Sequence, residues 1–491
     1  MEKKVHLQEI IYGSSDSVIS RRISKWQTEG RIRKIAPRIY TSNFEDSPEE
    51  IIRRNIFPIL GHLYPGAVLS HRSAFEFAPT ASNQIFVTYK YTKKVQLPGI
   101  TIRFLEGPGA VEGDTFFSGE LMVAQRERAF LENLQTSRQT GANSKALAYP
   151  QLEDKLEKII RVNGEEALNE LRDKAREISQ QLGMEREFER LNKMISALLK
   201  TRPSNELKSP LATARSMGNP YDPARIQLFE ILFRHLKQLE FKYRDEKNIT
   251  NEAYRNFAFY ESYFSNYIEG TVFEIDEAKK VIATQKPLPA RTEDSHDILG
   301  TYQLVSNRQE MRIVPYSAEN FLEILQYRHE ILLSARDDKK PGKFKDKNNQ
   351  AGDTFFVDME LVRGTLLQGF DFYQALVHPF TKAAYIMFVV SEVHPFLDGN
   401  GRLARIMMNA ELSAAKQTKI IIPTVYREDY LGALRRLTRN NDPKVYTRML
   451  ERAHAFSDTL MANDMEGFEE ILRRSNAFKE SSDGVLRIAE V

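Results

Sequence analysis

The chain has 491 residues, of which 41% are hydrophobic and 28% charged, and its net charge of +3 favours no class of partner by itself. This length predicts two or three domains rather than a single core. Because cysteine is absent, a disulfide framework, thiolate catalysis and cysteine-bound zinc are excluded. The N-terminus lacks the apolar run of a signal peptide, and no window of about 18 apolar residues occurs, so we expect a cytoplasmic protein with no membrane partner.

The first clear pattern is a short helix followed by a hairpin. Apolar residues recur at helical spacing from Val18 to Trp26, and Gly30 ends the expected helix. Two alternating stretches, 31–35 and 38–40, then indicate a pair of antiparallel strands. This layout is typical of a winged helix-turn-helix.

The same region is strongly basic. Against one acid, eighteen residues hold seven cations, namely Arg21, Arg22, Lys25, Arg31, Arg33, Lys34 and Arg38. Such a patch can contact the phosphates of DNA, and the candidate contacts are Arg21, Arg22, Lys25 and Arg33. A solvated basic face on a small packing module is the alternative.

Residues 1–135 resemble the AbiEi-like winged-helix regulators. Besides the helix and the hairpin, the resemblance rests on the stretches 71–75, 84–90 and 125–131. It implies an α+β, winged-helix-like N-terminal domain, for which DNA is the candidate partner.

A helical connector and linker is expected next, over 136–224. Two charged amphipathic helices are predicted within 150–199, with a break near Gly164. The prolines and glycine of 201–224 indicate a linker.

The remaining half is almost entirely helical in pattern. Short loops between amphipathic stretches over 225–476 indicate a compact helical bundle, followed by a C-terminal tail over 477–491. One segment, 342–357, has apolar ends and a turn-forming centre, which predicts a β-hairpin that serves as a flap. The expected helices are 223–241, 250–268, 318–335, 358–372, 379–392, 400–415, 427–439, 443–463 and 465–475.

The densest group of reactive side chains is the stretch His394-Pro-Phe-Leu-Asp-Gly-Asn-Gly-Arg-Leu-Ala-Arg405. Gly399, Asn400 and Gly401 suit a tight turn whose backbone N–H groups face one concavity. A helix is expected to begin near Asn400, so its positive end faces the same concavity.

The charged residues of this stretch complete a polyphosphate cradle. Arg402 and Arg405 offer planar guanidiniums that match phosphate oxygens. Asp398 is placed to hold a divalent metal that bridges phosphates, and His394 to accept a proton from a hydroxyl group. A helix-capping turn with surface arginines is the alternative, and the joint occurrence of these groups disfavours it.

The stretch resembles the signature of the Fic family, His-x-Phe-x-(Asp/Glu)-Gly-Asn-(Gly/Lys)-Arg-x-x-Arg, at every position. The resemblance covers about 224–463 and implies an all-helical core that transfers AMP from ATP to a Ser, Thr or Tyr hydroxyl of a protein. It also implies that His394 is the base and that Asp398 binds Mg²⁺ or Mn²⁺. The turn and the two arginines would bind the ATP phosphates, with Arg405 on the γ-phosphate. Gly401 favours nucleotidyl transfer, because phosphotransferases resembling the Doc toxin carry Lys there.

A second motif, Ser265-Asn-Tyr-Ile-Glu269-Gly270, lies at the end of an expected helix. Glu269 opposes the helix dipole there, so it is either a surface residue or has a cationic partner. The segment resembles the inhibitory (Ser/Thr)-x-x-x-Glu-(Gly/Asn) motif of Fic enzymes. That resemblance implies that Glu269 pairs with Arg405, that Ser265 helps to hold the helix, and that AMP transfer is autoinhibited.

Two further assignments rest on the resemblance alone. The flap residues Asn349, Gln350, Ala351 and Gly352 would dock the target protein as an added strand. Tyr430 is the best match to the aromatic residue that family members place over the adenine.

Two other functions fit the same residues. Glu269 could orient a water molecule that removes AMP from a modified target. Alternatively, the chain could be a DNA-binding regulator that senses ATP and does not need His394. The family resemblance also admits a homodimer.

Overall fold

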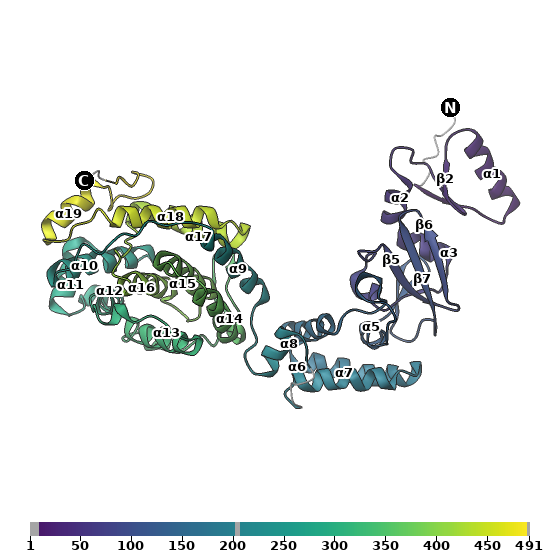
Figure 1. The fold of residues 1–491 in the computed structure, drawn as a ribbon, viewed down its shortest axis with the longest axis horizontal. Helices are drawn as coiled ribbons and strands as arrows, with labels where there is room; N and C mark the ends of the chain where they lie inside the picture. Colours follow the sequence, from purple (N-terminus) through teal and green to yellow (C-terminus); the bar gives the residue numbers. More distant parts are fainter. Residues whose placement is uncertain (1–8, 202–206, 489–491) are drawn as a thin grey trace. The chain divides into compact units, whose positions relative to one another are not determined.

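The computed structural model describes residues 9–201 and 207–488. It divides into two compact units, Met1–Met217 and Gly218–Val491 (Figure 1). Each unit has its own hydrophobic core.

The N-terminal unit begins with a three-stranded antiparallel sheet in the order β1-β3-β2. Its elements are β1 (Ile10–Tyr12), α1 (Ser17–Thr28), β2 (Arg33–Ala36) and β3 (Ile39–Thr41). Asp16 caps α1, because its carboxylate accepts from the backbone N–H groups of Val18 and Ile19. The predicted helix and hairpin are therefore present. The pairing of β1 with β3 adds a strand that the sequence pattern did not indicate.

A six-stranded mixed sheet follows, in the order β6-β7-β5-β4-β9-β8. Its strands are β4 (Val68–Leu69), β5 (Gln84–Tyr89), β6 (Lys93–Leu97), β7 (Ile100–Glu106), β8 (Thr115–Ser118) and β9 (Leu121–Val123). The neighbouring helices are α2 (Pro48–Arg54), α3 (Ile56–Leu63), α4 (Ser73–Glu76) and α5 (Arg126–Asn133). Buried isoleucines of α2 and α3 share a core with β5 and β7. The N-terminal part is thus α+β.

The expected connector packs with the N-terminal unit. Phe130, Leu131 and Leu134, in and just after α5, share a core with α6 (Tyr149–Leu182), α7 (Glu185–Leu198) and α8 (Pro210–Ser216). The prediction of two helices in 150–199 was incomplete. The chain kinks at Gly164, where φ is 84°, and breaks again at Gly183, so three helical segments result. The prediction of a linker over 201–224 missed α8, whose first turn is capped by Ser209. Residues 202–206 of the predicted linker lie outside the described residues.

The C-terminal unit is a helical bundle. Its helices are α9 (Pro223–Lys237), α10 (Asn251–Ile268), α11 (Ile275–Thr284), α12 (Thr292–Val305), α13 (Ala318–Leu332), α14 (Val362–Gln374), α15 (Pro379–Val393), α16 (Asn400–Ala414), α17 (Arg427–Asn440), α18 (Pro443–Ser457) and α19 (Met465–Arg474). The structure confirms the mainly α class. The pattern missed α11 and α12, and it extended α18 to 463. Helix α18 ends at Ser457, and the Asn248 side-chain amide binds the backbone of Leu460 and Ala462 in the segment that follows.

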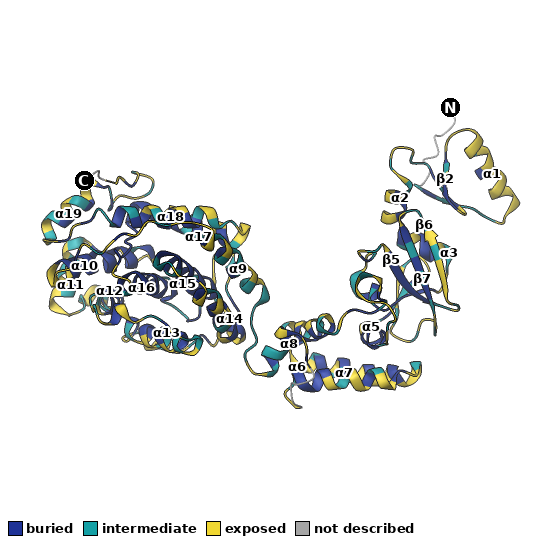
Figure 2. Ribbon diagram, in the orientation of Figure 1, coloured by how far each residue is buried: buried dark blue, intermediate teal, exposed yellow. Residues whose placement is uncertain are grey.

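Helices α15 and α16 lie at the centre of this unit (Figure 1) and are buried along nearly their whole length (Figure 2). Their burial holds the turn between them, 394–399, in a fixed place. His378, which shares the tripeptide His-Pro-Phe with the signature, is the N-cap of α15. Its Nδ1 accepts from the N–H of Phe380 at 3.1 Å, so its role is structural.

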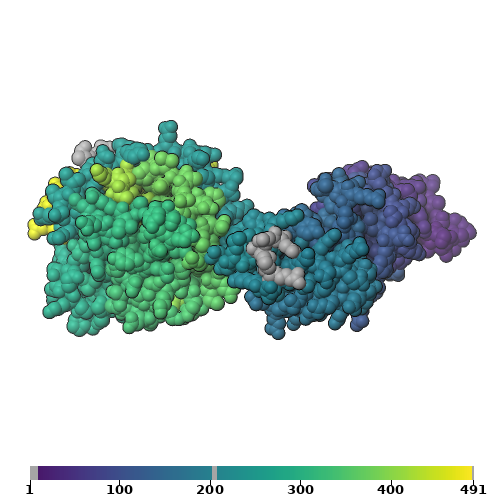
Figure 3. Space-filling model, turned by 60° about the horizontal axis from the view of Figure 1, so that its bottom comes forward, coloured from purple at the N-terminus to yellow at the C-terminus, as the bar shows by residue number. Residues whose placement is uncertain are grey.

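The flap is present as a short hairpin of β10 (Gln350–Ala351) and β11 (Thr354–Phe355). The expected tail packs on the bundle, since Ala477 and Leu486 are buried in its core. Figure 3 shows the last described residues, in yellow, at the surface of this unit. Within the described residues, no helix is both long and apolar enough to span a bilayer.

Buried neutral histidines make the stability of this unit pH-dependent. His454 donates from Nε2 to the Thr418 carbonyl at 3.0 Å, and burial lowers its pKa from 6.5 to about 4. A depressed histidine pKa means that the unfolded chain binds more protons. The stability is therefore complete above about pH 6.5 and is lost as the pH falls toward 4, by up to about 3 kcal/mol for such a residue. Urea unfolding at pH 7 and pH 4.5 should show a smaller pH effect in His454→Gln, whereas a control on α12, His296→Gln, should keep it.

Candidate active site

The turn between α15 and α16 is fastened by its own side chains. Asn400 accepts from the N–H of Phe396 through Oδ1 and donates to the Phe396 carbonyl through Nδ2, both at 2.9 Å. His394 and Gly399 both adopt left-handed backbone, with φ of 52° and 72°. Asn400 thus shapes the turn with its side chain, and its backbone N–H remains at the open end of α16.

His329 on α13 contacts the turn at 394–399 and holds it in place, a role that the sequence did not reveal. Its Nδ1 accepts from the N–H of Gly342 at 3.0 Å, so Nε2 carries the proton and donates to the Asp398 carbonyl at 3.1 Å. Its ring also stacks on Phe396, with centroids 3.8 Å apart. Burial lowers the pKa of His329 to about 4, which keeps it neutral at pH 7.

His394 is oriented as a proton acceptor. Its Nδ1 lies 3.2 Å from the Ser391 carbonyl, which can only accept, so Nδ1 carries the proton and the lone pair is on Nε2. Phe356 of the flap stacks on the imidazole, with centroids 3.7 Å apart and an interplanar angle of 5°. Burial, together with the nearby charge of Lys345, lowers the pKa of His394 to about 4. The ring is therefore neutral at pH 7.

The N-terminus of α16 is the place where the sequence predicts an anion site. The first backbone N–H groups of a helix have no partner within the helix, and its dipole favours negative charge there. Asp398 stands beside it, with its side chain 41% exposed and its Oδ1 accepting from the N–H of Gly399 at 2.6 Å. Among the described residues there is no group of three or more acidic or histidine side chains that could hold a metal alone. A single, partly exposed carboxylate beside a helix N-terminus has the chemistry to ligate a Mg²⁺ ion that takes most of its ligands from phosphates and water.

Arg405 and Glu269 form an ion pair, with 2.6 Å between Nη2 and Oε1. The same guanidinium donates to the hydroxyl and carbonyl oxygens of Ser265, at 3.0 and 2.8 Å, and to the Tyr430 hydroxyl at 3.3 Å. Partial burial raises the pKa of Glu269, but Arg405 more than offsets this and holds that pKa below its usual value. The Arg405 side chain is 6% exposed, so each of its nitrogens already has a protein partner in this state.

Glu269 also lies directly over the anion site. A Cβ atom at Gly401 would overlap the Glu269 carboxylate. The absence of a side chain at Gly401 therefore allows the end of α10 to approach the N-terminus of α16. A carboxylate at this position competes with a phosphate for the same positive end.

Arg402 has a partner that the sequence did not indicate. Its Nη1 lies 2.7 Å from Oδ2 of Asp297 on α12 and 3.4 Å from the side-chain oxygen of Asn266. The side chains of Arg402 and Asp297 are 3% and 8% exposed. Arg402 therefore fixes α16 against α10 and α12.

Removal of Asp297 should destabilise this unit. Asp297→Ala removes the nearest counter-charge of a buried guanidinium and leaves only Asp398, 3.8 Å away, which costs up to about 3–5 kcal/mol. Asp294→Ala is a matched control, because Asp294 pairs with Arg291 on the exposed side of the same region and should change stability by about 0.5 kcal/mol or less. Urea unfolding measures both. Equal effects of the two variants would contradict this interpretation of Asp297.

Some of these residues line a cavity of about 520 Å³. Its walls include His394, Gly401, Arg405 and Glu269, together with residues of the flap and α17, but neither Asp398 nor Arg402. A cavity of this size is in the range of small-molecule sites.

Among the residues assigned to the nucleobase and to the target, Tyr430, Ala351 and Gly352 line this cavity, whereas Asn349 and Gln350 do not. Tyr430 is almost fully buried, and its hydroxyl is bound to Arg405. Asn349 turns inward, where its Nδ2 donates to the Phe396 carbonyl at 2.9 Å. Gln350, Ala351 and Gly352 are exposed, and the hairpin has a free edge.

The candidate DNA contacts belong to the N-terminal unit. Arg21, Arg22 and Lys25 are exposed on α1, whose only buried side chain is Ile23 (Figure 2). Arg33 differs, because its guanidinium donates to the carbonyls of Asn43 and Asp46. The Arg33 guanidinium therefore already has two hydrogen-bond partners within the fold, which leaves fewer of its N–H groups for a phosphate.

Comparisons with known proteins match the part of the chain that contains the stretch 394–405. Residues 320–412 match the model of the Fic/DOC family. Two relatives, each called protein adenylyltransferase Fic, are 26% identical: one from Drosophila persimilis over 209 residues, covering 40% of this chain and 39% of the relative, and one from Drosophila melanogaster over 212 residues, covering 40% of each. The chain thus spans about two-fifths of the length of these curated relatives.

Two solved structures are similar at lower identity. A Fic-domain-containing signaling protein from Bacteroides thetaiotaomicron has a TM-score of 0.38 and 18% identity, covering 50% of this chain and 97% of that chain. Fic-1 from C. elegans has a TM-score of 0.35 and 15% identity, covering 67% and 89%. The family match covers α13 to α16 and includes the complete signature, so residues 320–412 form a Fic/DOC family domain within the C-terminal unit.

Proposed function

We propose that the C-terminal unit is a protein adenylyltransferase, which transfers AMP from ATP to a hydroxyl side chain of a target protein and is inhibited by Glu269. The observation that carries the proposal is that a neutral imidazole, the open N-terminus of α16 and Arg405 line one cavity. The relatives named protein adenylyltransferase support the reaction type.

The chemistry follows from where each group lies. Nε2 of His394 accepts the proton of the target hydroxyl, the oxygen attacks the α-phosphorus, and diphosphate leaves. The N–H groups at the start of α16 and the guanidiniums of Arg402 and Arg405 neutralise the charge that develops on the phosphate oxygens. Asp398 would hold Mg²⁺ or Mn²⁺, which supplies further charge neutralisation on the ATP phosphates.

Inhibition follows from competition for Arg405. In the observed state Arg405 is bound to Glu269, Ser265 and Tyr430, so it cannot also hold a γ-phosphate in full. ATP would then bind with its α-phosphate in a position that the target hydroxyl cannot attack.

The proposal is tested by mass spectrometry of a cell lysate incubated with ATP and the Glu269→Gly protein. We expect AMP adducts on Ser, Thr or Tyr residues of one or a few proteins, absent when His394→Ala is added. Phosphoryl adducts, or no adduct at all, would overturn the proposal.

A second activity of the same site is removal of AMP. Glu269 itself lines the cavity, where its carboxylate can orient a water toward a phosphate bound at α16. AMP release from a modified target that requires Glu269 supports this; release that persists in Glu269→Gly rejects it.

The N-terminal unit is a separate candidate for DNA binding. The exposed face of α1, which carries Arg21 and Arg22, favours it. Binding should weaken as salt rises and should be lost when both arginines become alanine, while AMP transfer does not change.

A further inference from the structure

Arg225, near the start of α9, connects the flap to the helix that carries His394. Its Nη2 donates to the carbonyl of Phe355 at 2.7 Å, and its Nη1 lies 3.0 Å from Oε1 of Glu392. Phe355 ends β11, and Glu392 lies two residues before His394 on α15. The Arg225 and Glu392 side chains are 20% and 4% exposed, so water screens this contact only weakly.

The residue that follows Phe355 contacts His394 directly. Phe356 lies flat on the imidazole, as described above. The hydrogen bond from Arg225 to the Phe355 carbonyl therefore restrains the backbone next to this ring. Without it, β11 would keep its pairing with the two residues of β10 and the hydrogen bond from Arg439 of α17 to the Thr354 hydroxyl.

Arg225 and Glu392 are themselves held in place. Asp222 caps α9 by accepting from the N–H of Arg225 at 3.2 Å, and its own N–H donates to the Thr365 hydroxyl of α14 at 2.9 Å. On the other side, the Thr438 hydroxyl of α17 donates to Oε2 of Glu392 at 2.7 Å. Residues of four helices, α9, α14, α15 and α17, therefore hold Arg225 and Glu392 in the position from which Arg225 binds the flap.

We infer that Arg225 is a positioning residue, which holds β11 and Phe356 over His394 so that a target strand added to the flap presents its hydroxyl to the imidazole. The catalytic consequence rests on the proposed function, whereas the restraint on the flap does not. Arg225 acts through Phe356 and touches no reacting atom. ATP binding should therefore not depend on it.

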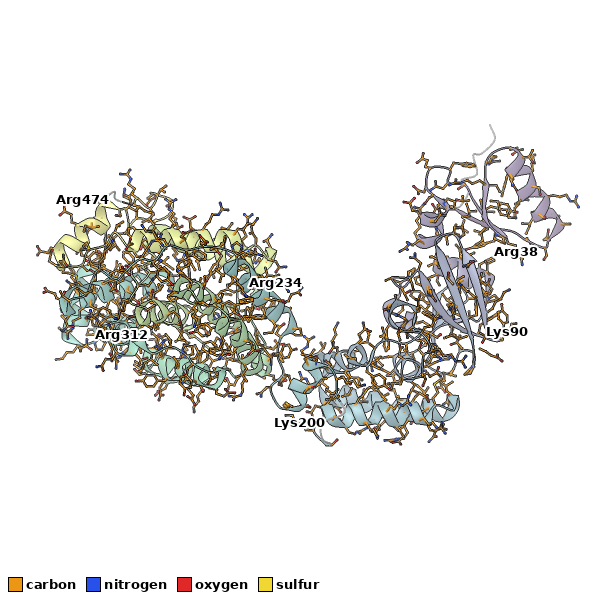
Figure 4. All side chains as sticks on the ribbon, viewed as in Figure 1. Arg38, Lys90, Lys200, Arg234, Arg312 and Arg474 are labelled. Carbon is orange, nitrogen blue, oxygen red and sulfur yellow. The ribbon has the colours of Figure 1, made fainter. Side chains whose placement is uncertain are left out.

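Hydrogen exchange of the full chain tests the restraint. In Arg225→Ala, the flap amides over 350–356 should exchange about tenfold faster, because a charge-assisted hydrogen bond is lost, while the amides of α15 and α16 stay protected. Arg225→Lys keeps a charged donor and should restore part of the protection. Arg234→Ala is the matched control, since Arg234 is on the same helix with its side chain 70% exposed (Figure 4).

Two results would overturn the inference. One is flap exchange that is unchanged in Arg225→Ala. The other is faster exchange throughout the unit, or an equal change in Arg234→Ala, either of which would mean general destabilisation rather than positioning.

Kinetics in the Glu269→Gly background test the catalytic consequence. Arg225→Ala should lower kcat for AMP incorporation into lysate protein about tenfold and leave the KM for ATP within about twofold, with partial rescue by Arg225→Lys. A raised KM with unchanged kcat contradicts the positioning role. If Glu269→Gly incorporates no AMP at all, the proposed function fails, and the exchange experiment still decides the role of Arg225.

Discussion

Glu269→Gly is expected to raise the rate of AMP incorporation from ATP by about 10- to 150-fold. A hydrogen bond between charged groups contributes about 1.5–3 kcal/mol, and each 1.36 kcal/mol corresponds to a factor of ten. Glu269 is 34% exposed, which favours the lower part of this range. The substitution also removes the carboxylate that lies over Gly401, so the N-terminus of α16 becomes free for phosphate.

The measurement is the initial rate of label transfer from ATP that is radioactive at the α-phosphate. Glu269→Gln keeps the shape of the side chain but not its charge, and should give an intermediate rate. Glu240→Gly, in an exposed loop of the same unit, should behave like the unmodified protein. A Glu269→Gly protein that is no faster than the unmodified one would contradict the inhibitory role.

His394→Ala in the Glu269→Gly background should lower AMP transfer by about 10²- to 10⁴-fold, the usual contribution of a general base. His378→Gln is a suitable control, because His378 has the same tripeptide but only caps α15. An equal loss in both variants would show that the effect is structural.

The pH dependence gives a further check on His394. Burial places its pKa at about 4, and only the neutral imidazole has a free lone pair on Nε2. The rate should therefore stay constant from about pH 8 to pH 5 and fall below that, as the ring becomes protonated. A fall centred near pH 6.5, the value of an exposed histidine, would contradict the buried environment.

The sequence was most informative where the site is contiguous. His394 to Arg405 lie in twelve consecutive residues, so their chemistry could be predicted from one stretch. The pairing of Glu269 with Arg405 also agrees with expectation, because an acid at a helix C-terminus indicates a cationic partner.

Contacts between distant segments could not be predicted in this way. Asp297 lies on α12, where polar residues interrupt the apolar periodicity that would have indicated a helix. Its partner, Arg402, is far along the chain. Arg225 and Glu392 are even further apart, and neither lies in a recognisable motif. The role of His329 could not be predicted, because its two hydrogen bonds go to backbone groups that the sequence does not specify.

The most direct test of the account uses two preparations of ATP, one labelled at the α-phosphate and one at the γ-phosphate, with the unmodified protein, Glu269→Gly, and Glu269→Gly with His394→Ala. The account predicts that protein acquires label only from the α-labelled ATP, strongly with Glu269→Gly, weakly with the unmodified protein and at background with the double variant. Transfer of the γ-label to protein, or equal α-label in all three proteins, would contradict it.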